Sequence, residues 1–437
     1  MRAKAMNDKR EIVGIPCVGG KTKLADKLCS AIEDYCGKAG IDKVYDICGG
    51  GGKLCCSLDQ SKFSFIGYNE WEYGLASLMR ALQDKGNVVI ISNMVRHIID
   101  MIIKSDIDAD EETKCRVLFD VARKYVSCGP DDHPDLDITV AATLATIIIC
   151  GSVQNNRTTI HYLAKNNAGD IENSFNKILV KNMSYLDNFI NVNMSVRGME
   201  CTNMDCFDLI KKYHDDAGML LVIDPPYFDC TNGYKNDWPY SMHKELIRLC
   251  KDAKCSVMIC MHRKGLIPYL SLFNEDNWKC YMSDRIIHVS AKSDFDLIKH
   301  AKPEDRKIDI EKDKNKELYC NLIKVMAFQN QEKNNEGVEF TQLEKVVSEY
   351  IWCNFESGIS DKIASYSDAT DAISSYAEDI VYDFTDYTPA EYDKYYLDLE
   401  QAEQASAKGK KNKPKKYKHQ EVFDQIVELL ELPPIEN

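Results

Sequence analysis

Short apolar runs alternate with amphipathic segments along most of the chain, which is the pattern of a sheet built from βα units. Apolar residues recur every three or four positions in residues 22–35, 72–83 and 241–251, and this spacing predicts helices. The apolar runs between them predict strands at residues 44–48, 63–68, 88–92, 219–223, 255–260, 285–289 and 318–325. The chain is therefore expected to have an α/β fold.

Two regions interrupt this alternation and suggest a division into domains. Residues 93–203 have a mostly helical pattern around a Gly-Pro-Asp-Asp turn, which is typical of an inserted subdomain. After residue 330 come a tyrosine-rich acidic stretch, a lysine run and a last amphipathic segment at residues 421–432. We expect a catalytic domain at residues 1–92 and 204–330, an insertion at 93–203 and an extension at 331–437.

The charge is distributed unevenly along the 437 residues. The net charge is −14, but 11 basic and 23 acidic side chains follow residue 330, so the acidity belongs to the extension. The body is close to neutral and neither favours nor excludes a nucleic-acid partner. The 18 cysteines show no C-x-x-C spacing and are expected to be reduced thiols. No apolar run reaches the roughly 18–20 residues of a membrane span, and the N-terminus lacks a signal-peptide core, so a cytoplasmic protein without a membrane partner is expected.

A short motif, Asp224-Pro225-Pro226-Tyr227, directly follows the predicted strand at residues 219–223. Residues at the carboxyl end of a parallel strand face the ligand crevice of an open α/β sheet. A carboxylate and a neighbouring carbonyl can accept both N–H groups of a base amine and aim its lone pair at an electrophilic methyl group. The prolines fix the carbonyl direction, and the tyrosine offers a stacking face for a base taken out of its helix. The motif therefore favours amine methylation over the alternative, a simple strand exit with a capping aspartate.

A glycine-rich loop, Asp46-Ile47-Cys48-Gly49-Gly50-Gly51-Gly52, ends the first strong strand and allows close approach of a ligand to the backbone. This loop lacks G-x-G-x-x-G spacing. A second glycine-containing segment, Gly14 to Lys21, is not a P-loop, because Gly20 stands where that motif requires lysine. The aspartate before the glycines suits a cationic amine better than a phosphate. Glu70 follows the next strand, where doubly wound folds place a ribose-binding carboxylate, although a helix N-terminal charge is the alternative.

In this order the motifs resemble those of the Dam-like (D12 class) adenine-specific DNA methyltransferases. The segments that carry the resemblance are Pro16 to Lys21, Asp46 to Gly52, Asn69-Glu70-Trp71, Asp205-Cys206-Phe207, Asp224 to Tyr227, Thr231 to Tyr234 and Lys316 to Asn321. The resemblance is strongest at Asp224 to Tyr227.

The resemblance implies a Rossmann-like methyltransferase with a mixed, mainly parallel seven-stranded sheet, a helical insertion and a C-terminal helical extension. It implies S-adenosyl-L-methionine as the cofactor and no metal ion. The positions that it assigns to the cofactor are Cys17, Lys21, Asp46, Gly50, Gly52, Glu70, Asp205 and Asp224. The positions that it assigns to catalysis are Asp224, Pro225, Pro226 and Tyr227.

The implied activity is methyl transfer to the N6 amine of a flipped adenine in double-stranded DNA, by an enzyme of bacterial or phage type with or without a restriction partner. Asn155, Asn156 and Arg157 lie in a polar run that is faintly similar to the family's DNA-contacting loop, and a solvated turn is the alternative. Methylation of RNA or of cytosine N4 is a second hypothesis. A third is a non-catalytic, cofactor-binding protein that interacts with DNA.

The extension lies outside the resemblance. Seven lysines between Lys408 and Lys418 could bind phosphates or form a solvated linker. The tyrosine-rich block at residues 365–399 could dock on the body or on a protein partner. Truncation near residue 330 is expected to leave cofactor binding intact, because every motif assigned to the cofactor lies upstream.

Overall fold

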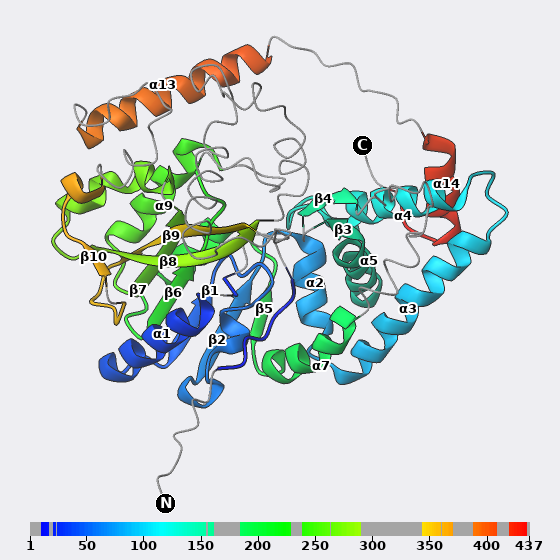
Figure 1. Cartoon of the computed structure of the whole chain (residues 1–437), viewed down its shortest axis with the longest axis horizontal. Helices are drawn as coiled ribbons and strands as arrows, with labels where there is room; N and C mark the ends of the chain where they lie inside the picture. Colours follow the sequence, from blue (N-terminus) through cyan, green and yellow to red (C-terminus); the bar gives the residue numbers. More distant parts are fainter. Residues whose placement is uncertain are drawn as a thin grey trace, which may run out of the picture.

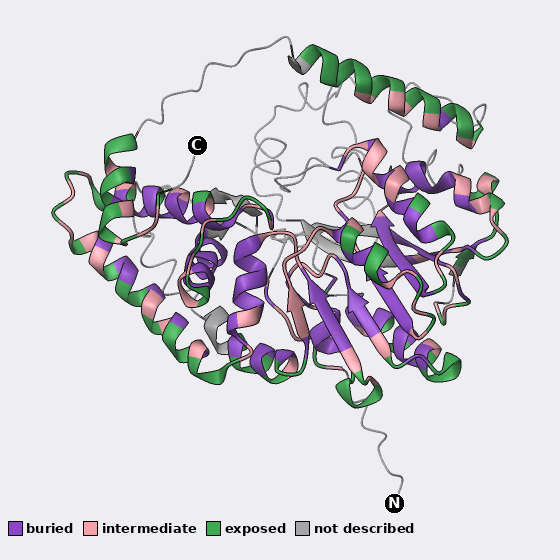
Figure 2. Ribbon diagram, turned by 180° about the vertical axis from the view of Figure 1, so that it is seen from behind, coloured by how far each residue is buried: buried purple, intermediate pink, exposed green. Residues whose placement is uncertain are grey.

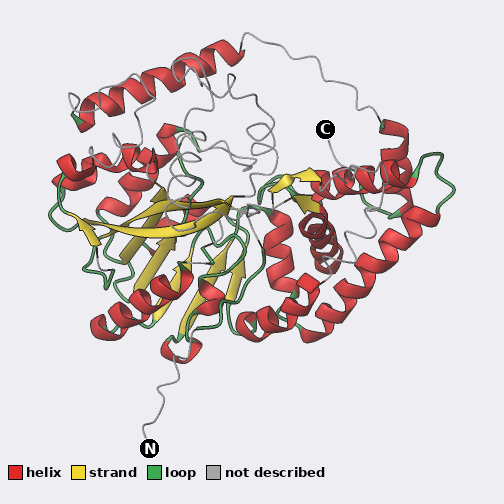
Figure 3. Ribbon diagram, viewed as in Figure 1, coloured by secondary structure: helices red, strands yellow, loops and turns green. Residues whose placement is uncertain are grey.

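A computed structural model of the chain describes residues 10–16, 21–22, 24–153, 156–160, 184–228, 238–262, 264–289, 343–359, 361–369, 388–408 and 419–434. In these residues a mixed sheet lies beside a block of helices (Figures 1 and 3). The predicted α/β class is confirmed. The sheet has eight strands, not the predicted seven, and their order is β10-β8-β9-β7-β6-β1-β2-β5.

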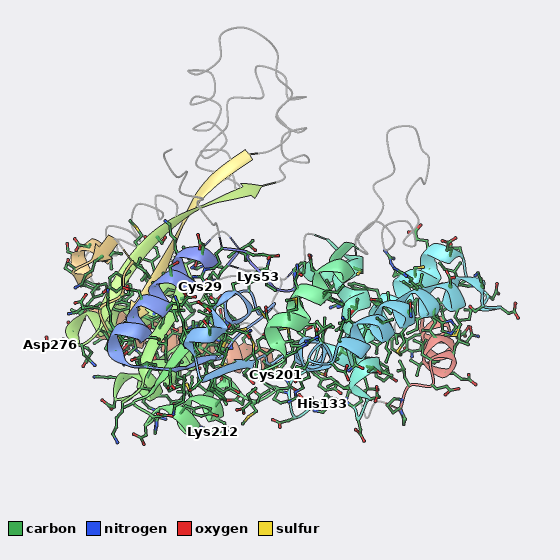
Figure 4. All side chains as sticks on the ribbon, turned by 90° about the horizontal axis from the view of Figure 1, so that it is seen from below. Cys29, Lys53, His133, Cys201, Lys212 and Asp276 are labelled. Atoms are coloured by element: carbon green, nitrogen blue, oxygen red, sulfur yellow. The ribbon has the colours of Figure 1, made fainter. Side chains whose placement is uncertain are left out.

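The sheet has a parallel half and an antiparallel half, which is consistent with a Rossmann-like fold. The parallel strands are β5 (Glu200–Thr202), β2 (Phe65–Asn69), β1 (Lys43–Asp46), β6 (Met219–Ile223) and β7 (Ser256–His262). The antiparallel strands are β9 (Leu343–Cys353), β8 (Lys279–Val289) and β10 (Asp361–Ile363). The ends of β8 and β9 project beyond the other strands (Figure 4), since their pairing continues past Ser283↔Glu349 to Val289↔Leu343.

Helices cover both faces of the sheet, and the strands between them are mostly buried (Figure 2). All five residues of β6 are buried, as expected for an uninterrupted apolar run in the middle of a parallel sheet. One face packs against α1 (Ala25–Ala39) and the other against α8 (Cys206–Tyr213) and α9 (Tyr240–Lys251). Short 3₁₀ segments connect the strands at η1 (Cys55–Ser57), η2 (Gln60–Lys62) and η3 (Lys264–Asn274).

The helical block contains α2 (Tyr73–Ala81), α3 (Lys85–Lys104), α4 (Glu111–Val126), α5 (Ile138–Gly151) and α7 (Ser184–Val196). The predicted strand at residues 88–92 is wrong, because these residues lie inside α3. Its β-branched residues favour a strand locally, but Val88, Ile91, Val95 and Ile98 are buried at helical spacing, and Asp84 caps the helix by accepting the Gly86 N–H at 2.7 Å. The helical insertion therefore begins before residue 93.

The long helix α3 differs from the expectation that no segment is long and apolar enough to span a membrane. Over the described residues it is the one helix that is long and apolar enough to cross a bilayer by length and composition alone. The sequence analysis missed it because residues 88–92 were assigned to a strand. A core helix of a globular domain passes the same test, and α3 buries a stripe against the helical block.

Two segments of the C-terminal region, β9 and β10, belong to the sheet. Strand β9 lies between β7 and β8, so the predicted boundary at residue 330 falls too early. The predicted closing strand at residues 318–325 lies outside the described residues.

Two C-terminal helices dock on different parts of the body (Figure 1). In α13 (Pro389–Lys408), Asp393 accepts the Tyr240 hydroxyl at 2.5 Å and Glu400 accepts the Ser241 N–H at 3.0 Å, so this helix holds the beginning of α9. In α14 (Gln420–Leu429), Phe423 and Ile426 are buried against the side of α4. The predicted amphipathic helix at residues 421–432 is confirmed, while most of the lysine run lies outside the described residues.

Candidate functional site

Acidic side chains gather where the parallel strands end. The last residue of β1, Asp46, is paired with Tyr68 of β2 and Val222 of β6, so the segments that follow these strands leave the sheet at one edge. Side chains alternate between the two faces of a strand. Val44, Val222 and Ile351 all belong to the core on the α1 face. Residues two positions away from them, which are Asp46, Asp224 and Glu349, therefore point toward that face.

A buried ammonium lies at the centre of this acidic cluster. The Lys21 Nζ donates to both carboxylate oxygens of Asp224 at 2.7 Å, and it lies 3.8 Å from Glu349 Oε2. It also contacts the Tyr227 hydroxyl. The Lys21 carbonyl accepts the backbone N–H groups of Leu24 and Ala25 at 2.8 and 2.7 Å, so the lysine is fixed at the beginning of α1.

The Tyr227 hydroxyl joins the two carboxylates. It donates to Asp224 Oδ1 at 3.0 Å and lies 2.9 Å from Glu349 Oε2. The ring of Tyr227 is tilted against that of His262, with 5.0 Å between ring centroids. Pro225 is buried and Pro226 is half-buried, so both prolines lie against the protein beside this network. The structure thus brings Lys21, Asp224 and Tyr227 into direct contact.

Glu349 was missed by the sequence analysis. It lies in β9 opposite His262 of β7 and Ser283 of β8, and its side chain is fully buried. Its only signal in the sequence is an acidic residue directly before the apolar stretch Tyr350-Ile351-Trp352-Cys353. That signal could have been recognised only with the strand pairing known, because an isolated glutamate at a strand is usually exposed.

The charges of the cluster shift its pKa values. Burial raises the pKa of Asp224 and the charge of Glu349 raises it further, while Lys21 opposes both effects. Burial alone would lower the pKa of Lys21, but Asp224 and Glu349 outweigh it and raise this pKa. The lysine therefore remains an ammonium ion in this cluster.

Asp46, at the end of β1, is the third acidic residue of the cluster and is buried. Burial raises its pKa to about 7, and the neighbouring charge of Asp224 contributes to the rise. Hydrogen bonds from the backbone N–H and the thiol of Cys55 oppose it. Near neutral pH this carboxyl group is therefore divided between its protonated and ionised forms.

The glycine loop is held over this edge by Glu70. The Gly50 N–H donates to Glu70 Oε2 at 2.8 Å, and the Glu72 N–H donates to Glu70 Oε1 at 2.9 Å. Gly50 and Gly52 have φ angles of 51° and 67°, which residues with a side chain rarely adopt. Glu70 thus shapes the loop that is assigned to the cofactor.

The remaining predicted residues have separate surroundings. Asp205 caps α8 by accepting the Phe207 N–H at 2.8 Å, which gives it a structural role. Asn156 and Arg157 begin β4 (Asn156–Ile160), which pairs with β3 (Ser152–Val153) at the end of α5. Cys17 and Asn155 lie outside the described residues. Within the described parts of the chain, no group of three or more His, Cys, Asp or Glu side chains could hold a metal ion.

Comparisons with known proteins leave the site to be interpreted from its own chemistry. No protein-family model matches the chain, and no curated protein matches it. The likeness to the Dam-like methyltransferases therefore depends on the motifs and their order in the sequence. What the geometry adds is an acidic cluster around one ammonium ion, beside a glycine loop.

Proposed function

We propose that the protein transfers a methyl group from S-adenosylmethionine to the N6 amine of an adenine flipped out of double-stranded DNA. The observation that carries the proposal is the position of Asp224, at the carboxyl end of β6 and in contact with Lys21 and Tyr227. The Dam-like order of motifs supplies the reaction class. A Rossmann-like methyltransferase fold belongs to the same proposal.

The residues present fit such a cofactor. The loop has left-handed backbone at Gly50 and Gly52, and the acidic side chains of Asp46 and Asp224 beside it favour a cation. When bound, S-adenosylmethionine supplies an electrophilic methyl group on a positively charged sulfur. Lys21, Asp46 and the glycine loop would hold it, with Glu70 next to the ribose.

Asp224 is the residue proposed to act on the amine. A carboxylate with a raised pKa can accept an N–H hydrogen bond, stabilise the positive charge that develops on nitrogen and take up the proton that the nitrogen loses. The Pro225 carbonyl is the proposed acceptor for the second N–H group. The ring of Tyr227 would stack on the base, and Asn155, Asn156 and Arg157 are the proposed DNA contacts of the insertion.

Transfer of labelled methyl groups to DNA, followed by nucleoside analysis, tests the proposal. The wild-type protein should produce N6-methyladenine. Asp224→Ala should lower the rate by about 10²–10³, as is typical when one preorganised polar group is lost at a reacting centre. Asp208→Ala, which removes an exposed carboxylate on α8, is the control and should retain the wild-type rate.

Three results would contradict parts of the proposal. Methylation of cytosine N4, or of RNA alone, would contradict the proposed substrate. Cofactor binding without any transfer would favour a non-catalytic protein that interacts with DNA. An Asp224→Ala protein with the wild-type rate would remove the assigned mechanism.

A further inference from the structure

One ammonium ion lies between two carboxylates at unequal distances. Both oxygens of Asp224 are 2.7 Å from the Lys21 Nζ, whereas the nearer oxygen of Glu349 is 3.8 Å away. The Lys21 side chain is 6% exposed and that of Glu349 is 0% exposed. The pair is therefore shielded from water. In such a buried environment an ammonium ion is stable only beside a negative charge.

This arrangement conflicts with the role proposed for Asp224. Both of its oxygens accept from Lys21, and Oδ1 also accepts from the Tyr227 hydroxyl. An amine that gains positive charge during methyl transfer would be repelled by an ammonium ion held on the same carboxylate. Lys21 must therefore release at least one oxygen of Asp224 before the amine can bind there.

Glu349 is placed to receive the ammonium. Its Oε2 is about 1 Å too far from the Nζ for an ordinary charged hydrogen bond, a distance that rotation of the terminal lysine torsions can cover. Its position is fixed by its pairing in β9 between β7 and β8. The Tyr227 hydroxyl, which contacts both carboxylates, can remain on Glu349 during the exchange.

We propose that Glu349 is a positioning residue that takes over the Lys21 ammonium when Asp224 engages the target amine. This inference rests on the proposed function. The exchange keeps Lys21 beside a carboxylate throughout and leaves Asp224 with an uncompensated negative charge where the amine nitrogen becomes positive. With Lys21 moved away, the effect that lowers the pKa of Asp224 is weakened, which makes Asp224 a better proton acceptor.

The test compares cofactor affinity with the rate of a single turnover on DNA. Glu349→Gln has nearly the same shape but no charge to hold Lys21. We expect its affinity for S-adenosylmethionine, measured by calorimetry, to stay within about twofold of wild type, while the single-turnover rate falls at least about tenfold, less than for loss of a direct contact. Glu349→Asp keeps the charge but retracts it by one methylene, and it should show an intermediate rate.

Glu356→Gln is the matched control, because Glu356 also accepts a tyrosine hydroxyl at 2.9 Å, from Tyr281, but lies outside the site. It should leave both affinity and rate unchanged. A thermal unfolding curve for each variant identifies a folding defect, and Glu349→Asp then carries the test if Glu349→Gln does not fold.

The outcomes separate the two proposals. A wild-type protein that transfers no methyl group contradicts the proposed function itself. A wild-type protein that is active, with a folded Glu349→Gln or Glu349→Asp variant that reacts at the wild-type rate, overturns the role of Glu349 alone. Equal losses of affinity and rate also overturn it, because they indicate a general disturbance of the site.

Discussion

The two halves of the sheet present their acidic side chains in different ways. In the parallel half, Asp46 and Asp224 lie at or just beyond the ends of strands, and the Asp224 side chain is 26% exposed. In the antiparallel half, Glu349 lies within the eleven-residue strand β9 and is fully buried. The parallel half therefore offers groups to a ligand, whereas the antiparallel half supports those groups from behind.

This difference shows that the charged cluster is not a property of the parallel half alone. Lys21 and Tyr227 each contact one carboxylate from β6 and one from β9. Strands β6 and β9 are not neighbours, because β7 lies between them. The charge balance of the cluster thus depends on a correctly ordered sheet across three strands.

The largest test of this comparison is to remove β9 and β10 from the antiparallel half. A chain that ends at residue 330 lacks β9, whose residues Tyr350, Ile351, Trp352 and Cys353 are fully buried. Burial of each such side chain contributes about 1.5–3 kcal/mol, and their sum approaches the entire stability of a typical domain, about 5–15 kcal/mol. We expect this chain to lose cooperative thermal unfolding and cofactor binding, measured by circular dichroism and calorimetry.

A chain that ends at Lys408 is the control, since it keeps β9, β10 and α13 and loses α14. It should remain folded with a lower midpoint of thermal unfolding. Cooperative unfolding and unchanged cofactor affinity in the shorter chain would show that β9 and β10 are dispensable, and would agree with the expectation that truncation near residue 330 leaves cofactor binding intact.

The sequence predicts the parallel half better than the antiparallel half for a physical reason. Strand β6 is an uninterrupted apolar run, and its bounds were predicted correctly at residues 219–223. The motif after it, and the glycine loop after β1, then follow from the rule that ligands bind at carboxyl ends of parallel strands. These local signals are sufficient to assign Asp46, Glu70 and Asp224 to one edge of the sheet.

The rest of the site depends on pairing between distant segments, which no local pattern contains. Glu349 is buried because β9 inserts between β7 and β8, and the order of the segments along the sequence does not indicate this position. The strand predicted at residues 88–92 fails for a related reason. Four consecutive β-branched residues favour a strand, but the buried stripe of α3 continues as far as Ile102 and decides the conformation.

The pH dependence of stability tests how the protein stabilises its buried acidic groups, and Asp46 is the first case. Its pKa in the folded protein, about 7, lies above the value of about 3.8 expected when unfolded. The folded state therefore holds a proton that the unfolded state has lost between these pH values, so the free energy of unfolding should fall as pH rises from about 4 to 7. The upper limit is about 1.4 kcal/mol per pH unit.

Asp46→Asn should flatten this dependence and stabilise the protein above pH 7, as measured by urea unfolding from pH 4 to 8.

Glu33 provides the opposite case. Burial raises its pKa, but hydrogen bonds from Arg10, Lys62 and the Asp59 N–H outweigh burial and lower the pKa to about 2. Its contribution is present above about pH 4.5 and lost toward pH 2, so Glu33→Gln should destabilise the protein at neutral pH. A pH dependence of wild-type stability that Asp46→Asn leaves unchanged would contradict the account of Asp46.

The smallest expected effect concerns the hydroxyl that connects the two halves. Tyr227→Phe removes the hydroxyl that donates to either Asp224 or Glu349 but keeps the ring, and such a bond contributes a net of about 0.5–1.5 kcal/mol or somewhat more beside a charge. Tyr227→Ala also removes the ring, whose stacking on a base contributes about 1–3 kcal/mol. We expect the rate of methyl transfer to decrease from wild type to Phe to Ala, with the larger step between Phe and Ala and with unchanged cofactor affinity in the Phe variant. A Phe variant as slow as the Ala variant would mean that the hydroxyl, and hence the connection between β6 and β9, matters more than the stacking face.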